Sequence, residues 1–503
     1  MLTWSPPMGA TDDDLSRLPS AAGLPGRPFD VPRKKRVFVN RNLRMDQIEL
    51  VGFDMDYTLA IYIQAEMERL SIELTLKKLV EGRGYSREIL GLPYPPELAI
   101  RGLMVDRAEG NVFKMDRHGH VGRVLHGLRA LTREERSTLY RRQRVRLAEP
   151  RYAWIDTLFA LPEAVIYLRL VDWLGKGGAP VDTDRLWTDV RASIDEAHRD
   201  DSLKSVIKAE LARFVVVDHD LPATLHKLRS SGKRLFVLTN SLWDYTDAIM
   251  RFLLDGKLPA YASWRSYFDI VIVGGKKPAF FTDAAPFVEL DAQTGAPLAE
   301  PVTALHRGRV YEGGNLASFE ELSGTRGDRV LYVGDHIYGD IVRAKRSSVW
   351  RTCMVVQELE PELATAERLA PKLRELEELD RKRRNLDAEI DYQNLVLKSL
   401  QRMAEEAGAG PADLAKRRAK AGLDDLRAAL RDATERHEQL EDEIDFAFNA
   451  HWGPTLKEGN EKSRFGEQVE DYACLYTSRV SNLLAYSPLR YFRAPRDKMP
   501  HEL

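Results

Sequence analysis

Four short apolar runs, each leading into polar residues, constrain the fold of this chain more than any other feature. The runs are rich in Val, Ile, Leu and Phe and are bounded by polar or glycine-containing turns, as expected of strands buried on both faces of a parallel sheet. Helical patterns such as residues 221–228 lie between them, which is typical of an α/β fold. The runs are residues 48–53, leading to Asp54; 234–238, leading to Thr239; 268–273, leading to Lys277; and 330–334, leading to Asp335.

These polar residues are expected to share one site. In open parallel sheets ligands bind outside the carboxyl ends of the strands, which is where each run delivers its polar residue. The sequence therefore predicts a Rossmann-like parallel-sheet core with a functional site at one edge.

Asp54 and Asp56 supply the paired carboxylates that phosphate-ester chemistry requires. Asp54, the first carboxylate after its strand, is our candidate nucleophile and would form an aspartyl-phosphate. Asp56 would give a proton to the leaving oxygen and later withdraw one from water. A hard cation, Mg²⁺ in the first instance, would find oxygen ligands in Asp54 and Asp335, while Asp340 either joins them or orients its neighbours.

Phosphate-binding groups follow the other strands. Thr239 and Asn240 offer hydroxyl and backbone donors to phosphoryl oxygens, and Lys277 offers a fixed positive charge for the transition state. Each residue also has a structural interpretation: Asp54 and Asp56 could cap a turn, Lys277 could be a solvated loop lysine, and the later aspartates could sit against a helix dipole. The order of the whole set after successive strands favours the catalytic interpretation.

The sequence resembles the haloacid dehalogenase superfamily and, within it, the cytosolic purine 5'-nucleotidase family. The likeness covers most of residues 36–357 and resumes near Phe465. It is carried by residues 36–41 (RVFVNR), 52–60 (GFDMDYTLA), 101–103 (RGL), 156–159 (DTLF), 161–163 (LPE), 334–341 (GDHIYGDI) and 350–352 (WRT).

This resemblance implies a Mg²⁺-dependent phosphohydrolase that acts on nucleoside monophosphates such as IMP and GMP. It also implies phosphoryl transfer to another nucleoside in some members, and a homo-oligomer. Asp56 would meet the metal through its backbone carbonyl, which leaves its carboxylate free for proton transfer.

Two stretches depart from the family's pattern. Residues 126–129 read HGLR where the family has HGFN, so an aromatic face is lost at Leu128 and a positive charge is gained at Arg129. These two residues are our candidates for altered substrate preference, since Arg129 could bind a purine oxygen or a second phosphate. Asp471 stands where similar enzymes have an arginine that helps bind an activating nucleotide, and a carboxylate would repel it. Nucleotide activation is therefore not carried over.

Length and spacing predict several domains. The 503 residues exceed what one core usually organises, and Asp54 and Thr239 are 185 positions apart (239 minus 54), which indicates an insertion between them. Within it we expect a β-hairpin at 110–120 and helices over 134–174, broken near Pro150, and over 184–214. The predicted parts are a flexible N-terminal segment 1–35; a catalytic core 36–69 and 215–365; a cap or substrate domain 70–214; a helical hairpin 366–450; and a C-terminal segment 451–503 that packs back on the core.

The prediction of a helical hairpin at 366–450 rests on two heptad seams separated by a helix-breaking tip at residues 408–411. Two helices folding back as an antiparallel pair is the simplest outcome, and a contact with another chain is the alternative. The seams are Leu376, Leu379, Leu386, Ile390, Leu397 and Leu400, then Leu423, Leu426, Leu430, Ala433, Leu440, Ile444 and Ala447.

Composition argues against several classes of partner. A net charge of −2, from 75 basic and 77 acidic residues, gives no global field for nucleic acid or anionic lipid. The two cysteines lack zinc-like spacing and favour a reducing compartment, and no apolar stretch has the length of a membrane span. We therefore predict a cytoplasmic protein that binds a small phosphate ester.

Two other functions stay open from the sequence. One is a phosphatase for a different small phosphorylated metabolite, for which Leu128 and Arg129 would be decisive. The other is an interaction protein with a silent site, whose heptad helices would be the working part.

Overall fold

A nine-stranded sheet forms the centre of the computed structural model, which describes residues 31–140, 145–146, 149–178, 180–342, 348–407, 411–496 and 499. Seven strands run parallel, and the edge strands β1 and β13 are antiparallel to their neighbours. In spatial order the strands are β1 (Phe38–Val39), β19 (Leu475–Thr477), β16 (Arg351–Val355), β15 (Val330–Gly334), β3 (Leu50–Phe53), β11 (Arg234–Leu238), β12 (Ile270–Val273), β14 (Val310–Gly313) and β13 (Phe287–Leu290).

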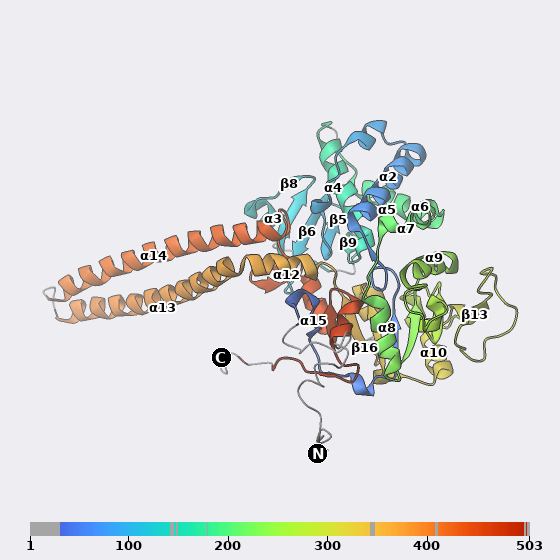
Figure 1. The fold of residues 1–503 in the computed structure, drawn as a ribbon. Helices are drawn as coiled ribbons and strands as arrows, with labels where there is room; N and C mark the ends of the chain where they lie inside the picture. The colour runs from blue at the N-terminus through green and yellow to red at the C-terminus, as the bar shows by residue number, and fades with distance from the viewer. Residues whose placement is uncertain are drawn as a thin grey trace, which may run out of the picture.

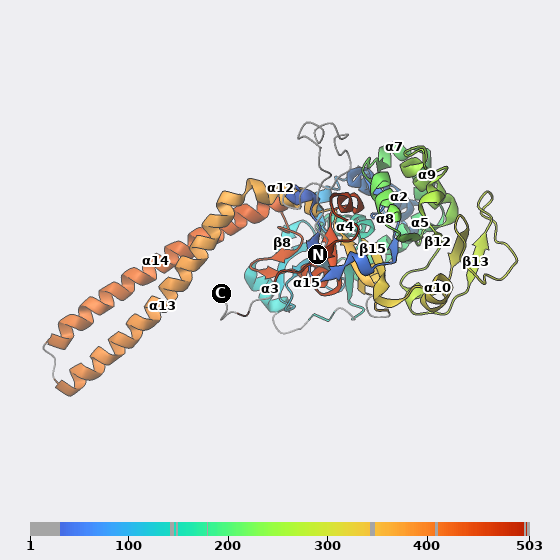
Figure 2. The same ribbon diagram turned by 60° about the horizontal axis from the view of Figure 1, so that its bottom comes forward.

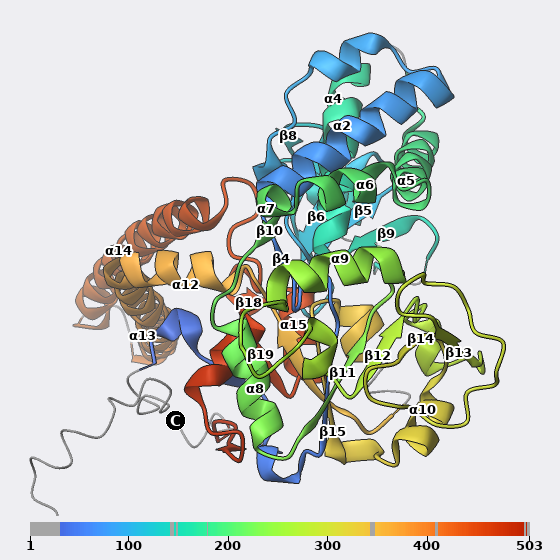
Figure 3. The ribbon, with the colours of Figure 1, turned by 45° about the vertical axis from the view of Figure 1, so that its right-hand side comes forward.

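The four predicted apolar runs form β3, β11, β12 and β15, which confirms the parallel-sheet prediction. Their side chains alternate between two hydrophobic clusters because successive residues of a strand face opposite sides of the sheet. Val51 and Val237 face the cluster beneath α8 (Leu221–Ser230) and α9 (Trp243–Leu254). Leu50 and Phe236 face the cluster that contains α10 (Leu316–Ser323). Figure 3 shows these helices beside the sheet.

The inserted segment leaves and re-enters the core at one place, where β4 (Ile61–Tyr62) pairs antiparallel with β10 (Val215–Val216). It stands above the core in Figure 1. The boundary predicted after residue 69 falls inside α2, so β4 and β10 are the better limits for a cap, whose status as a separate domain remains a proposal. Its elements are α2 (Gln64–Arg83), the antiparallel strands β5 (Leu103–Asp106), β6 (Asn111–Met115), β7 (Val121–His126), β8 (Arg129–Ala130) and β9 (Tyr152–Ile155), and the helices α3 (Arg133–Tyr140), α4 (Leu161–Gly175), α5 (Thr183–Arg199), α6 (Ser202–Ala209) and α7 (Leu211–Phe214).

A hairpin is present at the predicted place, but its second strand, β7, begins at Val121, beyond the predicted range of 110–120. The helix prediction over 134–174 was partly wrong. Residues Tyr152–Ile155 form β9, which pairs antiparallel with β5. Tyr, Trp and Ile fit a half-buried strand well, and the pairing with β5 outweighs the local helical periodicity. The helical pattern resumes as α4.

Two long helices, α13 (Ala370–Ala407) and α14 (Pro411–Phe448), form an antiparallel arm that projects from the body in Figures 1 and 2. Ion pairs of 2.8 Å join Lys372 to Glu443 and Glu375 to Arg436, as antiparallel helices require. The tip residues 408–410 lie outside the described residues. Buried seam residues of α14 include Leu423, Ala433, Leu440 and Ile444, and His437, which interrupts the seam, is buried with them.

The C-terminal segment packs back on the core, as β19 inserts between β16 and β1 and β20 (Tyr491–Phe492) pairs with β2 (Leu43–Arg44). Most of the predicted flexible start, residues 1–30, lies outside the described residues, whereas Val31 is buried and Arg33–Lys35 form a 3-10 turn. Within the described part of the chain, no helix combines the length and apolar character needed to cross a membrane.

The packing of the core leaves no room for a side chain at Gly52 of β3. A Cβ atom there would lie 2.0 Å from the ring of Phe236 on β11, whereas a Cβ at Gly82 of α2 would meet nothing within 4 Å. We expect Gly52→Ala to lower the free energy of unfolding by about 1–3 kcal/mol because the packed ring must move. Gly82→Ala should leave it unchanged or raise it slightly. Urea unfolding of both variants measures this, and equal midpoints would contradict the packing described.

Candidate active site

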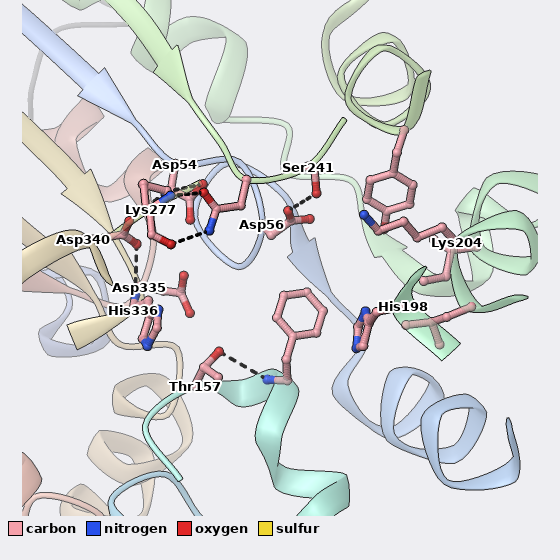
Figure 4. A pocket seen from close by; sticks show the side chains of 15 residues that line it. Asp54, Asp56, Thr157, His198, Lys204, Ser241, Lys277, Asp335, His336 and Asp340 are labelled. Carbon is pink, nitrogen blue, oxygen red and sulfur yellow. Dashed lines mark hydrogen bonds and ion pairs between the residues drawn. The ribbon is translucent and has the colours of Figure 1, made fainter. Parts of the chain in front are cut away.

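The strand ends predicted to form the site meet at one edge of the sheet. β15, β3, β11 and β12 are neighbours and parallel, so their carboxyl ends point the same way. A cavity of about 250 Å³ lies there, lined by residues of both the core and the inserted segment. Figure 4 shows these side chains around it. Of the predicted site residues, those that line the cavity are Asp54, Asp56, Asn240, Lys277, Asp335 and Asp340.

Three buried carboxylates form a compact cluster in this cavity. Asp54, Asp335 and Asp340 each offer one oxygen, and these oxygens lie within 4.8 Å of one another. Asp340 sits in a short π-helix, Ile337–Val342, and lies against Gly334, where an added Cβ would come within 2.5 Å of the carboxylate. The glycine at the end of β15 therefore lets Asp340 approach Asp335.

Lys277 lies among these carboxylates. Its Nζ is 2.9 Å from Asp54 Oδ1 and 2.7 Å from Asp340 Oδ1, and it donates to the Tyr332 hydroxyl at 2.9 Å. Although burial acts against its charge, Asp340 and Asp54 raise the pKa of Lys277 well above its ordinary value. Lys277 is therefore a fixed cation at the floor of the cavity.

Arg101, from the loop before β5, reaches the cluster from the inserted segment. Its fully buried guanidinium donates to the backbone carbonyl of Asp335 at 2.8 Å and is bidentate to Glu358, at 2.8 and 2.5 Å. It also lies 5.0 Å from the ring centroid of Phe465. Arg101 thus fixes the backbone of Asp335, while most of its charge is matched by Glu358.

The cluster carries more negative than positive charge, which suits a divalent cation. Asp335 Oδ2 is buried and accepts no hydrogen bond within the described structure, and its contact with Arg101 Nη1 is a longer ion pair of 3.7 Å. Burial, opposed by Arg101, raises the pKa of Asp335 to about 7, and burial, opposed by Lys277, raises the pKa of Asp54. Buried carboxylates with unsatisfied oxygens are costly unless paired or bound to metal. The donor set, all oxygen, is the kind that Mg²⁺ prefers.

Asp56 is held by two hydroxyl groups. Tyr62 donates to its Oδ1 at 2.5 Å, and Ser241 donates to its Oδ2 at 2.7 Å. The Tyr62 hydroxyl also lies 3.0 Å from that of Tyr245, which lines the cavity. Both carboxylate oxygens of Asp56 are therefore oriented, beside the cluster but separate from it.

The residues after β11 contact the backbone of Lys277 and of one another. The Asn240 side chain makes two hydrogen bonds to the backbone of Lys277. Its Oδ1 accepts from the Lys277 N–H at 2.5 Å, and its Nδ2 donates to the Lys277 carbonyl at 2.9 Å. Thr239 is fully buried, and its Oγ1 accepts from the N–H of Ser241 at 3.1 Å. Ser241, rather than Thr239, lines the cavity.

Rings and a lysine form the outer wall of the cavity, opposite the carboxylates (Figure 4). Phe159 meets His198 edge to face, with ring centroids 5.8 Å apart, and Lys204 Nζ lies 5.2 Å from the ring centroid of Tyr245. Burial lowers the pKa of His198, which favours the neutral imidazole. This wall can receive a flat, partly polar group.

His336, which lines the cavity, links the core to Asp156 of the inserted segment. Its Nε2 lies 3.1 Å from Asp156 Oδ2, and against the effect of burial this contact raises the pKa of His336 to about 9. The imidazolium and the carboxylate form an ion pair across the cavity margin.

Comparison with known proteins agrees with this arrangement. The sequence model of the 5' nucleotidase family matches residues 37–503. The chain belongs to this family. It is also similar to a 5'-nucleotidase domain-containing protein of Dictyostelium discoideum, with 28% identity over 472 residues that cover 93% of this chain and 74% of that protein. A likeness to a 2-haloacid dehalogenase of Pseudomonas syringae pv. Tomato, with 14% identity, covers 61% of this chain and 86% of that chain at a TM-score of 0.22, too low to bear on the fold.

Membership of the 5' nucleotidase family implies phosphoric monoester hydrolase activity, which the sequence motifs also predicted. The two candidate specificity residues, however, are not among those that line the cavity. Leu128 is exposed, and the Arg129 guanidinium pairs with both oxygens of Glu135 at 2.9 Å. Gly127 beside them abuts the backbone of Asp172, at the far end of α4.

Sequence reasoning gave no role to several side chains that line or adjoin the cavity, among them Tyr62, His198, Lys204 and Tyr245. Tyr62 and Tyr245 read as ordinary core aromatics, and His198 and Lys204 follow no strand and fall in a plain helical pattern. Phe159 lay within a matched motif but had no assigned role.

The two hydroxyl contacts on Asp56 predict a kinetic effect at Tyr62. We expect Tyr62→Phe to lower kcat of phosphate-ester hydrolysis about tenfold with little change in KM, because the proton-transfer group would lose part of its orientation. Steady-state kinetics measures this. Tyr94→Phe is a matched control, since it removes a tyrosine hydroxyl that donates to the Ile89 carbonyl, away from this cavity. Equal kcat in both variants would contradict a positioning role for Tyr62.

Proposed function

We propose that this chain is a Mg²⁺-dependent 5'-nucleotidase that hydrolyses purine nucleoside monophosphates through an aspartyl-phosphate on Asp54. The observation that carries the proposal is the buried cluster of Asp54, Asp335 and Asp340 around Lys277, at the floor of a cavity with a ring-lined outer wall. Family membership supports the phosphohydrolase part of this proposal.

Asp54 and Asp335 would hold Mg²⁺, together with the backbone carbonyl of Asp56 that the resemblance implies. Asp340 would be a further ligand or would orient its neighbours. When bound, the ion would offset the charge of the phosphoryl oxygens, which otherwise repels an attacking carboxylate.

The chain's own residues would then perform two displacements. An oxygen of Asp54 attacks phosphorus, the bond from phosphorus to the 5'-oxygen breaks, and Asp56 gives that oxygen a proton, which releases the nucleoside. Asp56 next withdraws a proton from water, which attacks phosphorus and breaks its bond to Asp54, releasing phosphate. Lys277 stabilises the added negative charge in both steps. Asn240 keeps Lys277 in place through its backbone.

The base of the nucleotide would lie against the outer wall, because the cavity runs from the carboxylates to Phe159 and His198. A purine offers a flat face for Phe159 and ring nitrogens for a neutral imidazole. Lys204 would lie near an exocyclic oxygen such as that of IMP or GMP.

Two broader expectations belong to the same proposal. The two cysteines, Cys353 and Cys474, are buried free thiols, which suits the reducing cytoplasm that we propose as the location. Assembly into a homo-oligomer is expected from the resemblance.

Phosphate release by the purified protein, with and without Mg²⁺, tests the proposed activity across nucleoside monophosphates and sugar phosphates. Metal-dependent release concentrated on IMP or GMP supports the whole proposal. Preference for a phosphate ester without a base would keep the mechanism and replace the substrate. Silence on the whole panel would contradict the catalytic function.

The nucleophile assignment makes a mutational prediction. We expect Asp54→Asn to reduce phosphate release about a thousandfold or more, since an amide oxygen cannot form the acyl phosphate. Asp425→Asn, a change at an exposed aspartate of α14, is the matched control and should keep wild-type rates. Circular dichroism would verify that both variants are folded, and substantial turnover by a folded Asp54→Asn protein would remove Asp54 from the role.

The outer wall makes a separate prediction about the base. We expect Phe159→Ala to lower kcat/KM for IMP about 10- to 100-fold, the usual effect of losing one stacking ring. Hydrolysis of ribose 5-phosphate, which has no base, should change little. A parallel loss on both substrates would show that Phe159 supports the fold of the site and does not bind the base.

A further inference from the structure

A groove on the inserted segment is separate from the catalytic cavity. It has a volume of about 540 Å³ and lies between one face of α2 and residues 90–96, which follow that helix. Figure 3 shows α2 running along the surface of the inserted segment. Among the described residues, none that lines this groove also lines the catalytic cavity. We call it the α2 groove, and its lining includes Glu68, Ile72, Leu76, Leu90, Tyr94 and Pro96.

The α2 groove offers apolar surface to a ligand. Ile72 and Leu76 of α2 are 8% and 3% exposed and form its floor. Leu90 and Tyr94 line it from the following segment, and Leu90 is 46% exposed. The Tyr94 hydroxyl donates to the Ile89 carbonyl at 2.9 Å, which fixes the ring in place. A concave apolar site of this size suits a small molecule.

One buried carboxyl group, that of Glu68, interrupts the apolar lining. Glu68 lines the groove although it is only 4% exposed. Its Oε1 accepts from Gln64 Nε2 at 2.7 Å, whereas its Oε2 is buried and has no hydrogen-bond partner in the described part of the chain. Burial, opposed by the hydrogen bond from Gln64, raises the pKa of Glu68 to about 7. A buried carboxyl oxygen without a partner is costly, so the groove favours a ligand that brings a donor to it.

The cations at the rim of the groove are paired with other carboxylates. Lys77 Nζ lies 2.8 Å from a carboxylate oxygen of Glu73, and a guanidinium nitrogen of Arg69 lies 3.1 Å from Glu66. The charge of an ionised Glu68 is therefore unmatched among the described residues. A ligand that enters the groove can supply the missing positive charge.

A primary ammonium group matches Glu68 better than other head groups do. It brings three N–H donors and a positive charge, so it can bond Oε2 and balance the carboxylate. A hydroxyl group brings one donor and no charge, and a carboxylate would be repelled. An apolar body attached to the amine would remove the surface of Ile72 and Leu76 from water.

We propose that the α2 groove is a binding site for a small amine with an apolar body, whose ammonium group meets Glu68 and whose body lies against Ile72 and Leu76. Gln64 occupies Oε1 of Glu68, so Oε2 is the atom that receives the ammonium group. Because the groove is separate from the catalytic cavity, the proposal stands or falls independently of the proposed activity.

Calorimetric titration of the full chain tests the ligand class with three probes that share one alkyl chain: octylammonium, octanol and octanoate. At about pH 8 the amine is charged and most Glu68 carboxyl groups are ionised. One octylammonium should bind per chain, at least about tenfold more tightly than octanol, because only the amine balances the carboxylate. Octanoate should bind more weakly than octanol. Failure of octylammonium to bind, or equal affinities for the amine and the alcohol, would overturn the proposal.

Substitution of Glu68 tests the contact with the head group. Glu68→Gln keeps the size of the side chain but removes its charge, so it should weaken octylammonium binding about tenfold and leave octanol binding unchanged. Glu81→Gln is the matched control, since it changes an exposed glutamate of α2 that is not among the residues lining the groove. It should bind both probes as the wild type does. Equal octylammonium affinity in the wild type and in a folded Glu68→Gln protein would overturn the proposal.

Two further variants locate the bound amine. Ala65→Trp places a large ring in the groove from an exposed lining position, so it should weaken octylammonium and octanol binding alike. Asp335→Asn changes the catalytic cavity and should leave both affinities unchanged. Loss of octylammonium binding in Asp335→Asn, with binding retained in Ala65→Trp, would place the amine among the catalytic carboxylates and overturn the proposal. Unchanged circular dichroism in every variant would exclude loss of the fold as the cause.

Discussion

The excess of negative charge around one buried lysine is the constraint on which the rest of the site depends. Asp54 and Asp335 converge because parallel strands deliver them at one edge, and Asp340 joins them from the π-helix that follows β15. Lys277 balances only part of their charge. Asp335 keeps a buried oxygen without a hydrogen bond. Buried carboxylates with this arrangement are costly in isolation, and a bound cation would offset part of that cost.

The same site is a junction between parts of the chain that are distant in sequence. Arg101 joins the inserted segment to Asp335, to Glu358 just before α12 (Leu359–Arg368), and to Phe465 on α15 (Arg464–Tyr472). Removing this guanidinium would leave Glu358 without its partner and Asp335 without its backbone anchor. The position of the Asp335 carboxylate therefore depends on how the inserted segment and the C-terminal region pack.

The core of the fold and most of its carboxylate cluster were predictable because strand ends carry local signals. A buried apolar run that leads into Asp54 or Asp335 places its residue at a known edge. The outer wall was not predictable in this way, since His198 and Lys204 reach the cavity only through the packing of α5 and α6. β9 was missed because its pairing with β5 is a long-range interaction. Leu128 and Arg129 differ from the family pattern, but a difference in sequence does not report a position in space.

Calorimetric titration of the substrate-free protein with Mg²⁺ tests the central claim most directly, namely that the carboxylate cluster is a cation site. Wild-type protein should bind one ion, and Asp335→Asn should weaken that binding at least about tenfold, because it removes one charged ligand. Asp425→Asn on the arm should bind as the wild type does. Equal affinity in wild type and Asp335→Asn, or no binding by either, would contradict the account.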